Sequence, residues 1–179
     1  MHHLRSRSGP ERVLECSDDC RACGVRDRLA DLDLPALLKT TGGKGLHVVV
    51  PLARRYDWQQ VQTFARAFTE EMARQDSAHY TARMAKAARH GKIFIDWLRN
   101  TRGATAVAAY STRARPGATV SVPLHWEELT ARLKADQYTV RTVPARLNKL
   151  RQAPWTDYEK LRAGLNARVR REFRVPGKT

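Results

Sequence analysis

One glycine-rich turn in the chain has the residue types that phosphate binding requires. The run Thr41-Gly42-Gly43-Lys44-Gly45 is followed closely by His47. Glycines let backbone N–H groups approach phosphate oxygens, while a threonine hydroxyl and a lysine ammonium add a donor and a positive charge. The spacing differs from that of a Walker A loop, which requires G-x4-G-K-[ST]. The turn alone therefore indicates phosphate binding and does not specify a nucleotide.

Two further groups of polar residues follow later in the chain. Asp96 ends the apolar run Ile93-Phe94-Ile95, where a carboxylate can either bind a metal ion or simply close a strand. Arg113 and Arg115 lie in a turn that ends in proline and glycine, and on their own they would be solvated loop charges. A glycine turn, a carboxylate and arginines that converge on one place would form a phosphoryl-transfer site.

The residues around these groups predict the strands that must position them. Residues 34–39 lead into the glycine turn, and the β-branched residues 48–50 lead out of it. Further strands are expected at residues 92–96, 105–110 and 119–122. We therefore expect an α/β or α+β fold with a mixed or antiparallel sheet flanked by helices.

The strongest helical pattern begins after Asp57, which is expected to cap a helix that starts at Trp58. Apolar residues then recur at helical spacing on one face, namely Val61, Phe64, Ala65, Phe68 and Met72. Shorter or weaker helices are expected at residues 81–88, 123–134 and 155–173. The last of these would carry a basic stripe, which is either a solvated face or a surface that contacts phosphate.

The composition indicates a polyanionic partner. The 179 residues include 33 Lys+Arg against 18 Asp+Glu, a formal net charge of +15. Nucleic acid is the first candidate, and a basic protein without such a partner is the alternative. No apolar run approaches the roughly 20 residues of a membrane span, and the start of the chain lacks a signal-peptide core. A membrane or secreted protein is therefore not expected.

The cysteines occur only at Cys16, Cys20 and Cys23, and their odd number argues against a disulfide framework. Three thiolates could hold an iron–sulfur cluster, as in the radical S-adenosylmethionine enzymes, but Ala22 stands where that pattern usually has an aromatic residue. A zinc site would need a fourth ligand from His2, His3 or Asp18. We expect cysteines without a metal, in a segment that is loop or disordered over residues 1–26.

Several ordered motifs resemble one known family. The run Lys39-Thr40-Thr41-Gly42-Gly43-Lys44-Gly45-Leu46-His47-Val48-Val49-Val50-Pro51-Leu52 closely resembles a signature segment of the primase–polymerase domain of bacterial DNA ligase D, within the archaeo-eukaryotic primase superfamily. Residues 91–100 and 108–118 resemble its second and third signatures, and residues 143–147 and 154–158 resemble its closing segment. The motifs follow in order from about residue 28 to about residue 165.

The resemblance implies a polymerase that adds nucleotides, often ribonucleotides, to broken DNA ends in non-homologous end joining. It implies two divalent metal ions, manganese or magnesium, and a nucleoside triphosphate as substrate. Its partners would be DNA ends, ligase and nuclease modules and the Ku end-binding protein, in the bacterial cytoplasm at the nucleoid and away from any membrane. By motif, Asp96 would be a catalytic, metal-binding carboxylate. The triphosphate would be held by Thr41, Gly42, Gly43, Lys44, His47 and Arg113, with Arg115 as a weaker match.

The family's first two metal ligands form an Asp-x-Asp pair, which a full helix separates from the glycine segment. Asp31 and Asp33 have this spacing but lie too close to Lys39 for such a helix, and we interpret them as helix-end or turn residues.

We therefore expect an unrelated or disordered leader at residues 1–27, a partial primase–polymerase domain at residues 28–165 and a basic tail at residues 166–179. Such a chain is expected to be truncated and inactive as a polymerase by itself. The alternatives are a non-catalytic remnant that binds DNA ends or nucleotide, and a product that does not fold stably.

Overall fold

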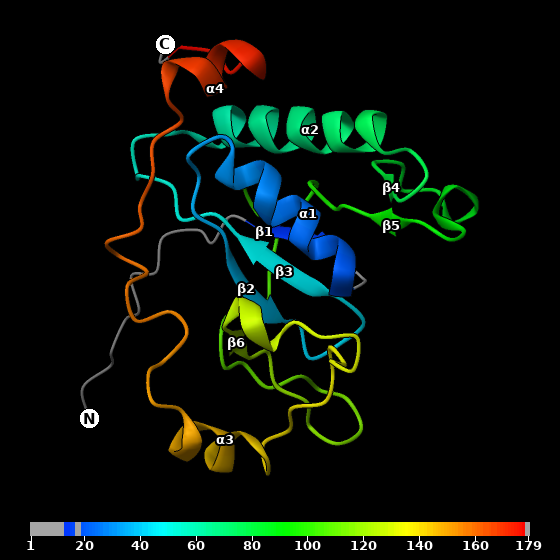
Figure 1. Cartoon of the computed structure of the whole chain (residues 1–179), viewed down its shortest axis with the longest axis vertical. Helices are drawn as coiled ribbons and strands as arrows, with labels where there is room; N and C mark the ends of the chain where they lie inside the picture. Colours follow the sequence, from blue (N-terminus) through cyan, green and yellow to red (C-terminus); the bar gives the residue numbers. More distant parts are fainter. Residues whose placement is uncertain (1–12, 17–18, 178–179) are drawn as a thin grey trace.

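A four-stranded antiparallel sheet lies at the centre of the molecule (Figure 1). The computed structural model describes residues 13–16 and 19–177, with side chains described from residue 22 onward. The strand order is β1-β3-β2-β6. These strands span Val13–Cys16 (β1), Leu46–Val49 (β3), Leu37–Thr40 (β2) and Pro123–Leu124 (β6). The fold class expected from the sequence is thus confirmed.

The alternation of side chains along β2 and β3 separates the two faces of this sheet. Leu38, Leu46 and Val48 belong to the main core, which also contains buried residues of the helices described below. Leu37 and Val49 face the other way, where Trp155, Tyr158 and Leu161 pack against them. Because successive strand residues point to opposite faces, the polar residues Lys39 and His47 share the second face with Leu37 and Val49.

Helix α2 (Trp58–Gln75) forms as the sequence predicts. The side chain of Asp57 accepts a hydrogen bond from the backbone N–H of Gln60, and the backbone N–H of Asp57 donates to Oε1 of Gln60, which completes a capping box. The predicted apolar face, with Phe64 and Phe68 at its centre, is buried in the main core. Phe173 packs edge-on against Phe64 at a ring separation of 5.3 Å.

Residues 13–16 and 19–26 correct the expectation of loop or disorder, because they form β1 and most of helix α1 (Asp19–Ala30). In α1, Ala22, Val25 and Leu29 recur at spacings of three and four and are fully buried. This helical pattern is weak in the sequence because α1 contains few large apolar residues to form the stripe. Residues 1–12 lie outside the described part of the chain.

The end of α1 shows what the Asp31-Leu32-Asp33 run does. Asp33 has a φ of +58°, in the left-handed region. Its N–H donates to the carbonyl of Ala30, and the N–H of Leu34 donates to the carbonyl of Leu29, which together form a Schellman motif. Asp31 and Asp33 are both exposed, so their interpretation as helix-end residues is confirmed.

The remaining elements are short. Strands β4 (Tyr80–Thr81) and β5 (Ile93–Phe94) form a parallel pair, and the 3₁₀ turns η1 (Lys86–Arg89) and η2 (Trp126–Glu128) replace the helices expected at residues 81–88 and 123–134. Helix α3 (Val143–Lys149) lies at the far end of the molecule from α2 and α4 (Figure 1). Within the part of the chain that the structure describes, no helix has both the length and the apolar character to span a bilayer.

Three of the expected elements are wrong. Residues 105–110 form no strand, and residues 119–122 make only isolated bridges, Thr112 with Val120 and Thr119 with Thr139. The helix expected over residues 155–173 is confined to α4 (Ala167–Glu172). It cannot extend further back, because Ala163 exchanges backbone hydrogen bonds with Pro51 and Ala53.

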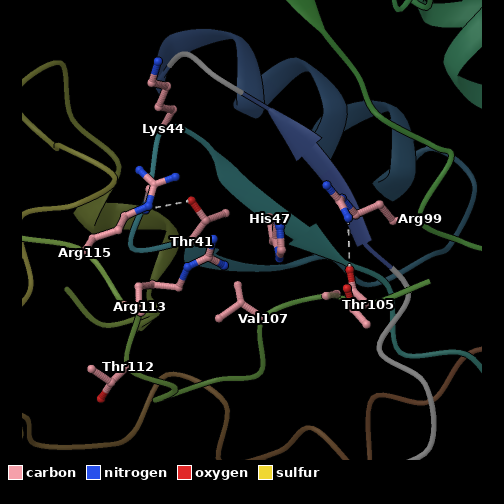
Figure 2. Close-up of a pocket in the computed structure, with 12 residues that line it drawn as sticks. Thr41, Lys44, His47, Arg99, Thr105, Val107, Thr112, Arg113 and Arg115 are labelled. Carbon is pink, nitrogen blue, oxygen red and sulfur yellow. Dashed lines mark hydrogen bonds between the residues drawn. The ribbon is translucent and has the colours of Figure 1, made fainter. Parts of the chain in front are cut away.

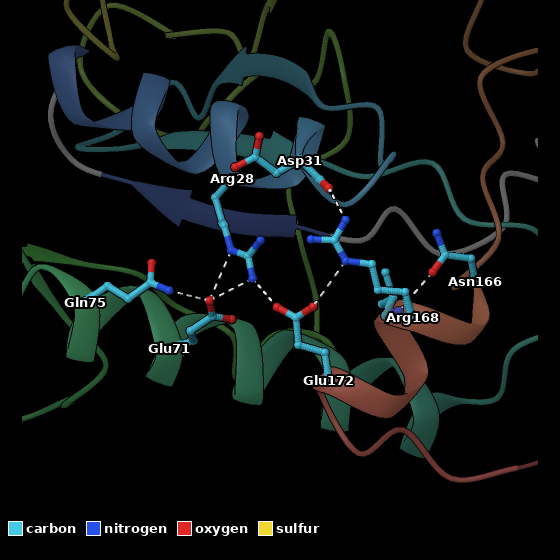
Figure 3. A network of polar contacts seen from close by, with 8 residues as sticks. Arg28, Asp31, Glu71, Gln75, Asn166, Arg168 and Glu172 are labelled. Carbon is cyan, nitrogen blue, oxygen red and sulfur yellow. Dashed lines mark hydrogen bonds and ion pairs between the residues drawn. The ribbon is translucent and has the colours of Figure 1, made fainter.

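A network of ion pairs joins the three main helices (Figure 3). Arg28 of α1 contacts Glu71 of α2 at 2.8 Å and also pairs with Glu172 of α4. Arg168 of α4 pairs with Glu172 at 3.7 Å and donates to the carbonyl of Asp31. Part of the basic stripe expected near the C-terminus is therefore engaged within the fold, because Arg168 joins α4 to the turn that follows α1.

Candidate functional site

The glycine turn between β2 and β3 is held in shape by the hydroxyl of Thr41. This hydroxyl donates to the carbonyl of Gly45 at 2.7 Å and accepts from the N–H of Gly43 at 3.2 Å. Gly42 has a φ of +64°, and a Cβ there would lie 3.0 Å from Cγ of Arg113 and 3.1 Å from the carbonyl carbon of Val120. Only glycine fits this position, for both conformational and steric reasons.

A pocket of about 690 Å³ opens beside the turn (Figure 2). Its lining brings together residues that are far apart in the sequence: Thr41, Gly43, Lys44, His47, Arg99, Thr105, Ala106, Val107, Thr112, Arg113, Ala114 and Arg115. The turn and residues 112–115 lie against each other at one side, the strand residue His47 forms the floor, and the segment at 105–107 forms another wall (Figure 2). The predicted convergence of the glycine turn with Arg113 is therefore observed.

The pocket gathers positive charge. Lys44, Arg99, Arg113 and Arg115 all line it, and no carboxylate is found in its lining among the residues the structure describes. The guanidinium of Arg115 lies against the turn, since a Cβ on Gly43 would be 3.6 Å from its Cζ. Arg99 also pairs with Asp96 outside the lining, whereas Lys44, Arg113 and Arg115 add to a concentration of positive charge that favours an anionic ligand with many oxygens.

His47 is a neutral group in this cationic setting. It is buried on β3, directly opposite Lys39 of β2. Burial, together with the nearby charges of Lys39, Arg99 and Arg113, lowers the pKa of His47 to about 3. Its imidazole therefore contributes hydrogen bonding and not charge at neutral pH.

Asp96 follows β5 and lies outside the lining of the pocket. One of its oxygens accepts a hydrogen bond from the N–H of Leu98, and the other lies 3.8 Å from Nε of Arg99. Asp96 is thus linked to the pocket through Arg99 and does not face Lys44 across it.

The described residues do not complete the two-metal centre that the resemblance implies. Two cations in a shared site require several oxygen ligands, mostly carboxylates. Among the side chains described, no three His, Cys, Asp or Glu residues come together, and Asp96 already pairs with a cation. Cys23 is described as a free thiol, whereas the side chains of Cys16 and Cys20 and the residues His2, His3 and Asp18 lie outside the described part.

Two features of the site were missed from sequence. Arg99 was not singled out, although its position three residues after Asp96 could have indicated an ion pair. The wall at residues 105–107 was expected to be a strand and instead is an irregular segment, whose carbonyl at Thr105 accepts a hydrogen bond from Nη1 of Arg99 at 3.2 Å.

The family described as "LigD, primase-polymerase domain" matches residues 13–155, which is most of the chain. The chain belongs to this family. The LigD match begins before the boundary expected near residue 28 and includes β1 and α1.

The multifunctional non-homologous end joining protein LigD of Pseudomonas aeruginosa is 47% identical over 146 residues, which cover 81% of this chain and 17% of that protein. The bifunctional non-homologous end joining protein LigD of Bacillus subtilis is 28% identical over 165 residues, 87% of this chain and 27% of that protein. The chain thus spans less than a third of the length of either relative.

A solved structure, the polymerase domain from Mycobacterium tuberculosis ligase D in complex with DNA, superimposes with a TM-score of 0.72 at 31% identity. The match covers 79% of this chain and 53% of that chain. This LigD neighbour confirms both the family and the mixed α/β fold inferred from the sequence motifs.

Proposed function

We propose that this chain is a primase–polymerase portion of a LigD-type repair protein and that its pocket binds the triphosphate of a nucleoside triphosphate. The single observation that carries the proposal is the convergence of Lys44, Arg99, Arg113 and Arg115 on one pocket beside the glycine turn. Polyphosphate recruits such groups because charge-assisted hydrogen bonds to phosphate are among the strongest available to a protein.

The residues of the pocket have different proposed roles in binding the triphosphate, which follow from their positions. Thr41 holds the turn by hydrogen bonds to Gly43 and Gly45, so its contribution to the ligand is to shape the turn. Arg113 and Arg115 lie against the turn and supply the charge. His47 at the floor stays neutral and offers a hydrogen bond without adding to the repulsion among the cations.

The proposed setting is a broken DNA end in the bacterial nucleoid, with the Ku end-binding protein and the ligase and nuclease modules as partners. The relatives' role in non-homologous end joining and the DNA bound to the M. tuberculosis domain support this setting. The net charge of +15 is suited to contact with DNA phosphates.

We propose that nucleotide addition in this family's site uses divalent metal ions, manganese or magnesium, and that this chain alone does not extend a primer. Asp96 adjoins the pocket through its ion pair with Arg99, and a single carboxylate does not hold two cations. A chain supplying further carboxylates would be needed for turnover.

Equilibrium binding of a fluorescent nucleoside triphosphate tests the first part of this proposal. The wild-type chain should bind the triphosphate much more tightly than the nucleoside, and Arg113→Ala should weaken binding. Lys160→Ala is the matched control, because Lys160 is exposed and pairs with Asp157. Equal affinity for nucleoside and triphosphate would contradict a polyphosphate site.

Primer extension with manganese tests the second part. We expect no extension by the chain alone. Robust extension that is abolished in Asp96→Ala would show that the chain is an active polymerase and would overturn the expected inactivity.

A remnant that binds DNA ends without nucleotide is the second candidate, and the net positive charge favours it. It predicts an affinity for DNA that falls steeply with salt, together with no binding of free triphosphate. A competition experiment distinguishes the two candidate functions. Free triphosphate competes with DNA for Arg113 if the pocket binds nucleotide, and it does not compete if the chain binds only DNA ends.

A further inference from the structure

Lys39 is a buried charge for which the pocket itself does not account. Its side chain is 0% exposed, on a strand within the sheet. Lysine is almost never fully buried unless its ammonium has partners. The pocket lining includes its neighbours His47 and Val107 but not Lys39, among the residues described. Lys39 therefore lies beside His47 on the same face of the sheet, outside the lining of the pocket.

The ammonium of Lys39 contacts the backbone of the pocket wall. Its Nζ donates to the carbonyl oxygen of Val107, and it lies 3.4 Å from the hydroxyl of Ser121. Ser121 is itself fixed, because its hydroxyl donates to the carbonyl of Thr40 at 2.7 Å. The strand that carries the glycine turn is thereby tied to another wall of the same pocket.

The wall segment, residues 105–107, has few other anchors. Thr105 and Ala106 are exposed, and Val107 is half-buried. Within the described part of the chain, none of the three takes part in a backbone–backbone hydrogen bond outside helices and strands. Two cations hold the wall segment by its carbonyls instead, Arg99 at Thr105 and Lys39 at Val107.

We propose that Lys39 is a positioning residue, whose buried ammonium holds the wall segment in place for a polyphosphate ligand that it does not touch. The part of this inference that concerns a ligand rests on the proposed function, whereas the part that concerns the wall does not. The ammonium of Lys39 also lies close to the floor of the pocket, where its charge adds to the positive potential that attracts an anion.

Lys39→Met tests this role, because methionine keeps much of the length of the side chain and removes the charge and the donor. Lys92→Met is the matched control, since Lys92 is exposed in the turn before β5. A cooperative melting transition first establishes that each variant folds. Lys39→Gln, which is neutral but keeps a donor, is the second variant if Lys39→Met does not fold.

The first readout is limited trypsin digestion followed by mass spectrometry. Arg102 is exposed and lies just before the wall segment, and Arg83 is exposed in a separate loop. Loss of the anchor should raise the rate of cleavage after Arg102 by at least about threefold relative to cleavage after Arg83, because only the wall opens locally. A merely structural loss of stability would raise both rates together.

The second readout is the affinity for inorganic tripolyphosphate. Lys39→Met should bind it roughly fivefold more weakly or worse, and Lys92→Met should bind like the wild type. An unchanged cleavage ratio together with an unchanged affinity would overturn the inference. If the wild type binds no tripolyphosphate, the proposed function fails, and the ratio of cleavage at Arg102 to that at Arg83 still decides whether Lys39 holds the wall.

Discussion

Two arginine-rich regions of this molecule differ in how their positive charge is balanced. In the helix network, Arg28 and Arg168 pair with the carboxylates of Glu71 and Glu172 (Figure 3). In the pocket, the guanidiniums of Arg113 and Arg115 border open space with no carboxylate in the described lining, whereas Arg99 pairs with Asp96 just outside that lining (Figure 2). The first region balances its charge internally, and the second presents its charge to a ligand.

This difference shows that, in a chain with a net charge of +15, arginines in different regions have different effects on stability and binding. Arginines that find carboxylates on other helices contribute to stability, because removing one partner leaves a partly buried charge alone. Arginines gathered without carboxylates repel one another and cost stability until an anion binds. The predictions below test whether the two regions respond as differently as their charge balance implies.

The largest expected effect is on stability, in the helix network. Arg28→Ala removes the shared partner of Glu71 and Glu172, whose side chains are 10% and 33% exposed. We expect the free energy of unfolding to fall by about 3 kcal/mol. Urea denaturation followed by circular dichroism measures this loss. Lys160→Ala, which breaks an exposed pair with Asp157, is the control and should cost less than about 0.5 kcal/mol.

A second change affects the glycine turn, where the fold and the pocket meet. Gly42→Ala places a Cβ at a φ of +64° and 3.0 Å from Cγ of Arg113. The expected loss of unfolding free energy is about 2 kcal/mol, accompanied by weaker triphosphate binding as Arg113 is displaced. Gly103→Ala is the control in stability measurements, because it shares a positive φ but has open space around it. Equal losses in both variants would show that the crowding at Gly42 has no consequence.

Arg113→Ala should produce the reverse of Arg28→Ala. Triphosphate affinity is expected to fall about tenfold, since one charge-assisted contact with phosphate is lost. The melting temperature without ligand should stay the same or rise, because the mutual repulsion of the pocket cations is reduced. Isothermal titration and a thermal melt measure both quantities. A large loss of stability in this variant would remove the distinction between the two regions.

The smallest effect for a single step of the experiment, one pH unit, concerns His47. Because the pKa of His47 in the folded chain is about 3, the unfolded chain takes up a proton near pH 6.5 that the folded chain does not. Stability is therefore lost as the pH falls from about 6.5 towards 3, by about 1 kcal/mol per pH unit from this group. His47→Gln should flatten this slope in denaturation curves at pH 7, 6 and 5. The exposed His90→Gln variant should retain the slope of the wild type.

Much of the pocket could be predicted from sequence because its determinants are local. The glycine turn, the β-branched strand after it and the Asp57 cap each act over a few residues, and the helix from Trp58 forms as expected. Family motifs then indicated that Arg113 would join the turn, and the two do line one pocket.

The parts that sequence reasoning missed depend on contacts between distant segments. Residues 105–107 are held by Lys39 and Arg99 through the carbonyls of Val107 and Thr105, which leaves no periodic pattern to detect. Trp155 and Tyr158 have helical spacing, yet they stack on each other and pack against the sheet. Asp96 was expected in the pocket and instead adjoins it through Arg99.

The most direct test of the account is a thermal melt with and without inorganic tripolyphosphate. The account predicts that the ligand raises the melting temperature of the wild type and of Arg28→Ala by similar amounts, although Arg28→Ala starts lower. The ligand should leave a combined Arg113→Ala and Arg115→Ala variant almost unshifted. A similar ligand-induced rise in that variant would show that the unbalanced cations of the pocket are not the polyphosphate site.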